Sequence, residues 1–218
     1  MTSTNIFAFW KTSLQVFTNP DQRKNFILGT LSLLRRGVIT LMKLFWWLPI
    51  IYVASLTLPT LNLLFFLSIN TVTFYLMIMS LRPSTEIKNY AYFYRYAKAL
   101  LIMLGVNLCI VLVPTASLLL APEILFLLFY LESDLSMNSA LLSVKKAFSV
   151  LLFCFPTLMF LCVPYSVMSA IILILLYKGP LGLILFAPLQ FLLSFLVLAA
   201  TTTYYLKLKH EHYNLFFE

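Results

Sequence analysis

Glu123 is the residue with the clearest potential for chemistry, because it follows Pro122 inside the apolar run LLLAPEILFLLFYLESD at residues 118–134. A carboxylate is costly at bilayer depth, so a functional glutamate there relays protons, binds a cation or pairs with a substrate amine. The structural alternative is that Pro122 breaks a short helix and Glu123 is protonated, or capped by the backbone amides freed there. The apolar segments offer no obvious cationic partner, since Lys43 belongs to another segment nearer the inner face.

Three amide side chains also fall inside apolar segments: Asn70, Asn107 and Gln190. Such groups commonly hydrogen-bond between membrane helices and stabilise each contact modestly. If they converge on Glu123, the same groups form a substrate or ion site. Both hypotheses stay open, and Glu123, Asn107, Asn70 and Gln190 are the candidate site residues.

Motifs for catalysis and cofactor binding are absent from the sequence. It contains no P-loop, no G-x-S-x-G nucleophile elbow and no H-E-x-x-H metal pair. His210 and His212 lie two residues apart, which points them to different sides of a helix, and no third ligand is evident. We expect no catalytic residue, no metal site and no cofactor.

The composition excludes an ordinary soluble domain. Hydrophobic residues make up 62% of the chain and charged residues 10%, whereas soluble domains carry about 25% charged residues. The net charge of +8 does not indicate a nucleic-acid partner, because the basic residues lie between apolar segments. Cys109, Cys154 and Cys162 all lie inside apolar runs, where a thiol behaves as a small hydrophobe, so we expect no disulfide framework.

Several apolar stretches of 18 or more residues are long enough to cross a hydrocarbon core about 30 Å thick, and there is room for roughly six spans. The apolar run from residue 100 to 131 is too long for one span, so we divide it near Pro114 into two short ones. Pro59, Pro114 and Pro180 mark the turns within successive pairs, and we expect Pro156 and Pro164 to break the fifth segment. The fold class is therefore all-α: a polytopic membrane protein of six transmembrane helices arranged as three hairpins. The expected spans are 38–58, 61–81, 97–113, 116–131, 149–177 and 181–206.

The basic residues orient these spans. With the N-terminus inside, Lys178 is the only one of 15 lysines and arginines that falls on the outer side. By the positive-inside rule, we expect both termini to be cytoplasmic. The composition, which is rich in Phe, Leu and Tyr, favours a bacterial host, so we expect the inner (plasma) membrane.

Amphipathic helices precede the first span. Phe7, Trp10, Leu14 and Phe17 recur every three or four residues, which predicts a helix lying in the membrane interface with its apolar side down. Asn19 is the predicted N-cap of a second helix that begins at about residue 20. The expected division is an N-terminal amphipathic segment 1–37, a membrane domain 38–206 and a cytoplasmic tail 207–218.

The segment 82–98 mixes tyrosines with basic residues. This composition is typical of binding to anionic lipid headgroups, or of ordinary anchoring at the membrane interface. The candidate headgroup ligands are Arg82, Lys88, Arg95 and Lys98.

The second half of the chain resembles a known group of membrane domains. The stretches are VPTASLLLAPEILFLLFYLESD, then NSALLSVKKAFSV, and finally TTTYYLKLKHE. They are similar to uncharacterised bacterial integral membrane proteins, and to the membrane domain attached to some glycerophosphoryl diester phosphodiesterases. The resemblance covers about 100 of the 218 residues. It implies a six-helix inner-membrane protein of undefined function in which the broken fourth helix is a trait of the fold.

Three functions fit these features. The first is a non-enzymatic membrane protein that binds a partner or organises other components, with the lipid bilayer and a membrane protein as its partners. The second is a small transporter or substrate-capture subunit with an intramembrane site around Glu123. The third, and least favoured, is a lipid-modifying membrane enzyme, which needs a polar cluster near the headgroups.

Overall fold

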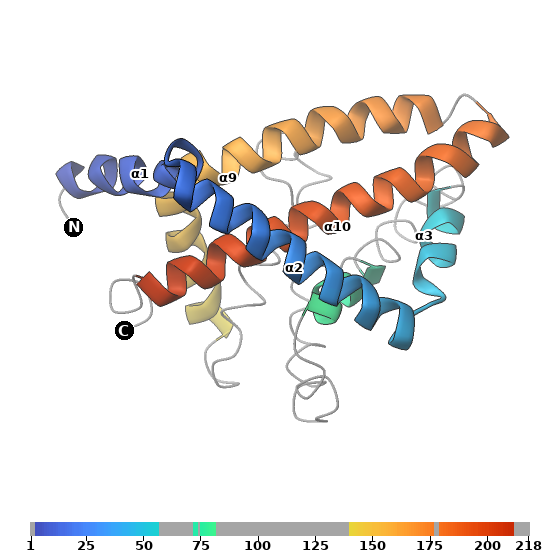
Figure 1. Cartoon of the computed structure of the whole chain (residues 1–218), viewed down its shortest axis with the longest axis horizontal. Coiled ribbons are helices and arrows are strands. Elements are labelled where there is room, and N and C mark those ends of the chain that lie inside the picture. The colour runs from blue at the N-terminus through green and yellow to red at the C-terminus, as the bar shows by residue number, and fades with distance from the viewer. Residues whose placement is uncertain (1–2, 57–71, 74, 82–139, 177–178, 212–218) are drawn as a thin grey trace.

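The computed structural model describes residues 3–56, 72–73, 75–81, 140–176 and 179–211, and this part of the chain is helical, without strands. Residues 72–73 and 75–81 are helical, and the second of these stretches is called the 75–81 helix below. Figure 1 shows how the other helices cross one another. They are α1 (Ser3–Thr18), α2 (Pro20–Leu44), α3 (Leu48–Leu56), α9 (Ala140–Leu176) and α10 (Pro180–Glu211). For the described residues, the all-α prediction is confirmed.

Two helices are long and apolar enough to cross a membrane, through Cys154–Ile172 of α9 and Ile184–Leu208 of α10. A third crossing is added if α2 and α3 together form one bent span. The prediction of a helical membrane protein is supported at this level. The expected spans 97–113 and 116–131 lie outside the described residues, so the arrangement of six spans stays a prediction.

The start of α2 matches its predicted capping signal. The side-chain Oδ1 of Asn19 accepts hydrogen bonds from the backbone N–H of Asp21 at 3.0 Å and of Gln22 at 3.5 Å. Pro20 occupies the first helical turn, where its missing N–H costs nothing, and Asp21 complements the positive end of the helix dipole. A cap of this kind stabilises a helix by about 1 kcal/mol.

The structure differs from the expected first span at 38–58. The helix α2 runs without interruption from Pro20 to Leu44, so the expected boundary between residues 37 and 38 falls inside a continuous helix. The chain then breaks after Leu44, and α3 leaves at 88° to α2. The expected segment 38–58 is thus divided between the end of α2 and α3, which meet nearly at a right angle.

The α9–α10 hairpin has the predicted turn. Gly179 has a φ of +137°, a conformation that side-chain-bearing residues rarely adopt, and Pro180 begins α10 directly after it. Figure 1 shows the later, orange part of α9 running beside α10. Glycine therefore fits the turn that reverses the chain between these two helices.

The two prolines of α9 do not break it as expected. The helix is continuous from Ala140 to Leu176 through Pro156 and Pro164. Figure 1 shows that it changes direction instead, because its first, yellow part runs steeply across the view before the helix joins α10. A proline removes one helical hydrogen bond and crowds the preceding turn, which bends a helix when neighbouring elements stabilise it.

Glycine allows α2 to cross α10 closely. A Cβ atom on Gly37 would lie 2.7 Å from Cδ2 of Leu81 and 2.9 Å from Cζ of Phe195. A Cβ atom on Gly29 would lie 3.1 Å from Cγ2 of Thr203. Small residues at helix crossings let backbones approach in this way, and membrane helices use them widely.

The described helices pack around large buried side chains, and their outward sides are apolar. Large side chains with almost no exposure occupy the interior, among them Leu41, Leu158, Phe195, Leu198 and Tyr205. The outward sides of α9 and α10 expose large apolar residues. These include Val163, Val167, Ile171, Ile174, Leu181, Ile184, Leu185, Leu189 and Leu192. An apolar surface of this extent suits lipid tails or another membrane helix better than water.

Candidate functional site

Two pairs of polar side chains connect α9 and α10 inside the hairpin. Tyr165 Oη and Ser194 Oγ lie 3.1 Å apart and share a hydrogen bond, and Gln190 Nε2 donates to Ser169 Oγ at 2.6 Å. Tyr165 and Ser169 are four residues apart on α9, as are Gln190 and Ser194 on α10. Since four residues is about one helical turn, the pairs form two successive contacts between antiparallel helices. We call these four residues the polar ladder.

Gln190 keeps one unsatisfied atom within this ladder. Its side chain is only 4% exposed, and its Oε1 has no hydrogen-bond donor among the described residues. A buried acceptor without a partner costs about 1–3 kcal/mol. Of the four candidate site residues from sequence, Gln190 is the only one in the described part of the chain. Glu123, Asn107 and Asn70 lie outside it, so their convergence stays a prediction.

A second polar cluster forms where α1 meets α9 and α10. Thr157 Oγ1 donates to Ser13 Oγ at 3.0 Å, and Ser13 Oγ donates to the carbonyl oxygen of Trp10 at 2.9 Å. The hydroxyl of Tyr204 is buried beside the thiol of Cys154. Serine, threonine and tyrosine hydroxyls of three helices therefore meet at a buried position, next to a thiol that behaves mainly as a small apolar group.

A carbonyl left without a helical partner by proline lies next to this cluster. Pro156 has no N–H, so the carbonyl of Leu152, four residues earlier, cannot form its usual helical hydrogen bond. The indole N–H of Trp10 donates to that oxygen at 3.2 Å. Sequence analysis assigned Trp10 to the apolar side of an interfacial helix, and missed this polar role of its ring.

Two basic residues attach α2 and α10 to their neighbours. Arg36 Nη2 donates to the carbonyl oxygen of Leu81 at 3.0 Å, at the last described residue of the 75–81 helix. Because the donor is charged, this hydrogen bond is stronger than one between neutral groups. At the other end of α2, Lys207 Nζ donates to Gln22 Oε1 at 3.0 Å. The predicted headgroup ligands Arg82, Lys88, Arg95 and Lys98 all lie outside the described residues.

The cysteines of the described helices fit their predicted role. Cys154 and Cys162 are both buried in the hairpin and show no disulfide. Cys109 lies outside the described part of the chain. Within that part, no three histidine, cysteine, aspartate or glutamate side chains gather as a metal site would require. The arrangement can form hydrogen bonds between helices.

Comparison with known proteins adds no assignment: no family model, curated protein or solved structure matches the chain.

The sequence contains a signal for the polar ladder. Tyr165 and Ser194 lie at nearly equal distances from the Gly179 turn, and Ser169 and Gln190 do as well. In an antiparallel hairpin, residues at equal distances from the turn face each other.

Proposed function

We propose that this protein is a non-enzymatic integral membrane component that acts by binding partners through its apolar outer faces. The observation that supports this is the polar ladder, in which Tyr165, Ser169, Gln190 and Ser194 bond to one another across the hairpin. Polar groups engaged in this way stabilise helix association and leave the outer faces of α9 and α10 apolar.

The proposed setting is the inner membrane of a bacterium, with six spans and both termini in the cytoplasm. The distribution of basic residues supports this orientation, since Lys178 alone lies in the expected outer turns. The two membrane-crossing candidates in α9 and α10 fit the fifth and sixth expected spans. The resemblance to phosphodiesterase-attached membrane domains stays a prediction about the second half of the chain.

Photo-crosslinking in native membranes tests partner binding. A photoreactive amino acid is placed at Val167 of α9 or at Leu189 or Leu192 of α10, all exposed positions. We expect crosslinks to discrete proteins at one or two of these positions. The same crosslinked products should form when the protein is expressed at its natural level. Adducts with lipid alone at all three positions would contradict the proposal. A photoreactive residue at buried Ala199 is the matched control and should crosslink only within the chain.

A small transporter or capture subunit is the second candidate, and the unsatisfied Oε1 of Gln190 favours it. A substrate donor or a protonated Glu123 would satisfy that oxygen if the candidate residues converge. Infrared pH-difference spectroscopy of the protein in nanodiscs, against Glu123→Gln, tests this candidate. A carboxyl band that titrates near neutral pH and shifts when Gln190→Leu is introduced favours transport. If neither Glu123→Gln nor Gln190→Leu changes the carboxyl band, Glu123 and Gln190 do not form one site.

A further inference from the structure

The corner between α2 and α3 carries tryptophans. Trp46 is 62% exposed and Trp47 is partly buried, and both lie between the end of α2 and the start of α3. Tryptophan is enriched at the level of lipid headgroups, where its ring faces the hydrocarbon and its N–H faces water. The expected span 38–58 places these rings well inside the membrane, whereas a span that begins with α3 places them at its edge.

The exposed side of α2 is itself divided into two edges. The buried side is formed by Thr30, Leu33, Gly37 and Leu41. On the exposed side, one edge is polar and consists of Asn25, Ser32, Arg36 and Lys43, while the other edge carries Leu28 and Leu31 between the basic residues Lys24 and Arg35. These spacings of three, four and seven residues keep each set on its own edge. A helix with this division suits the boundary between headgroups and acyl chains.

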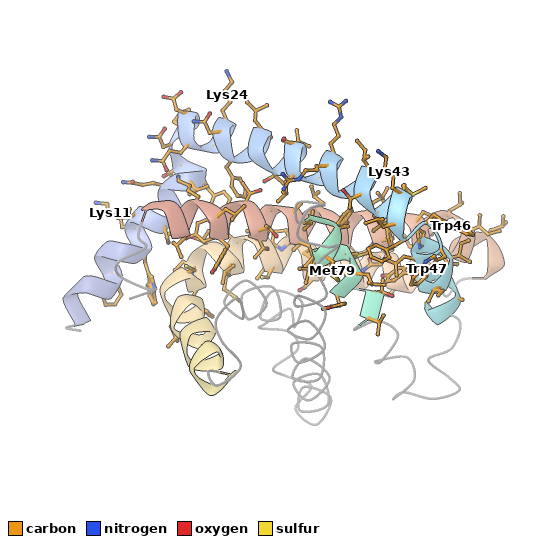
Figure 2. The ribbon with its side chains drawn as sticks, turned by 90° about the horizontal axis from the view of Figure 1, so that it is seen from below. Lys11, Lys24, Lys43, Trp46, Trp47 and Met79 are labelled. Atoms are coloured by element: carbon orange, nitrogen blue, oxygen red, sulfur yellow. The ribbon has the colours of Figure 1, made fainter. Side chains whose placement is uncertain are left out.

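The charge of α2 is predominantly positive. The helix contains five basic residues and one acidic residue, Asp21. Arg23, Lys24, Arg35 and Lys43 are exposed. Figure 2 shows Lys24 and Lys43 projecting from the same side of the helix, away from α10. Basic residues on an amphipathic helix attract the headgroups of anionic lipids.

We propose that the exposed side of α2 is a binding surface for the headgroups of anionic phospholipids. The helix lies along the membrane surface with Leu28 and Leu31 against the acyl chains, and the long side chains of Lys24 and Arg35 extend from the same edge to the headgroup layer. The 88° corner then turns the chain into the hydrocarbon, so α3, which is apolar throughout, begins the first span. This surface consists of other residues than the predicted headgroup segment 82–98 and the polar ladder.

Neighbouring residues on the two edges allow a test of depth. Leu31→Cys and Ser32→Cys, each labelled with bimane in the full-length protein, are reconstituted in nanodiscs that contain phosphatidylglycerol. We expect lipids with a quencher on the upper acyl chain to quench the label at residue 31, and aqueous iodide to quench the label at residue 32. Equal iodide quenching at both positions would place α2 in water, and equal lipid quenching would make it part of a span. Either result overturns the proposal.

The charges are tested by lipid affinity. Fluorescent phosphatidylglycerol or phosphatidylcholine is titrated into the full-length protein in neutral detergent. Neutralising Lys24 and Arg35 together as glutamines should weaken phosphatidylglycerol binding about fivefold for each cation and leave phosphatidylcholine binding unchanged. The control pair Lys145→Gln and Lys146→Gln, on α9, removes the same charge and should have a much smaller effect. An unchanged affinity, or an equal loss in the control pair, overturns the proposal. Circular dichroism verifies that each variant is folded.

Discussion

Trp10 of α1 donates the hydrogen bond to Leu152 that Pro156 cannot donate within α9. The indole N–H donates to the carbonyl oxygen of Leu152 at 3.2 Å, and that oxygen has no helical donor because residue 156 is a proline. Close to it, Thr157 donates to Ser13, which also belongs to α1. The N-terminal helix therefore supports α9 where its backbone bonding is interrupted, which explains how α9 changes direction without breaking.

Replacing Trp10 by phenylalanine removes this donor and keeps most of the apolar ring. We expect a loss of about 0.5–1.5 kcal/mol in the free energy of unfolding, which is the net contribution of one intramolecular hydrogen bond. Thermal unfolding in a mild detergent measures the change. In a Pro156→Ala background, residue 156 regains its N–H and bonds Leu152 within the helix. Trp10→Phe should then cost clearly less, and equal costs in both backgrounds would contradict this role of the indole.

The polar ladder predicts unequal effects of two serine substitutions. Ser169→Ala leaves both ends of the Gln190 amide without a partner among the described residues, whereas Tyr165 keeps another interaction when Ser194→Ala is made. Interhelical hydrogen bonds in membrane proteins contribute about 0.6 kcal/mol each, up to about 1.7. We expect Ser169→Ala to be near the upper value and Ser194→Ala near the lower one. Reversible unfolding in mixed micelles measures both, and the reverse order would contradict the assigned pairing.

The crossing of α2 and α10 predicts a difference between two glycines. In a free helix, alanine is more stable than glycine by about 1 kcal/mol. At Gly37 a methyl group would collide with the buried side chains of Leu81 and Phe195, so we expect Gly37→Ala to destabilise by about 1–3 kcal/mol. Gly29 faces only a methyl of Thr203 at 3.1 Å, and Gly29→Ala should be near neutral. Equal melting temperatures for the two variants would contradict the close crossing.

Gly179→Ala tests the turn of the hairpin. With a φ of +137°, an alanine at this position is strained by about 1–3 kcal/mol. We expect a lower melting temperature without loss of helix content, because α9 and α10 themselves are unchanged. Circular dichroism during heating measures both quantities. A variant as stable as the natural protein would show that the turn has a different backbone conformation.

The sequence predicted the elements whose signals are local. The cap at Asn19, the turn at Gly179 and the helical character of the described chain each follow from a few neighbouring residues. The break after Leu44 within the expected first span was not predicted, because the segment 38–58 is apolar on both sides of it.

The candidate site could be predicted only in part. Gln190 is a buried amide in a hydrogen bond between helices, as one of the two hypotheses for it stated. Its partner Ser169 was missed because serine is common in membrane helices and has no distinctive local pattern. We expected the prolines of α9 to break the helix. The contact that supports the helix at Pro156 comes from Trp10, which lies 142 residues away from Leu152 in sequence. Local rules do not include such distant partners.

The central claim is that the α9–α10 hairpin crosses the membrane, with its turn on the side opposite α2. The most direct measurement is labelling of single added cysteines in sealed, right-side-out vesicles with a membrane-impermeant maleimide. We expect Lys178→Cys, at the turn, to react from outside, and Lys24→Cys, on α2, to react only after the vesicles are opened. The natural protein is the control and measures any reaction of its own Cys109, Cys154 and Cys162. Reaction of both added cysteines from the same side would contradict the account.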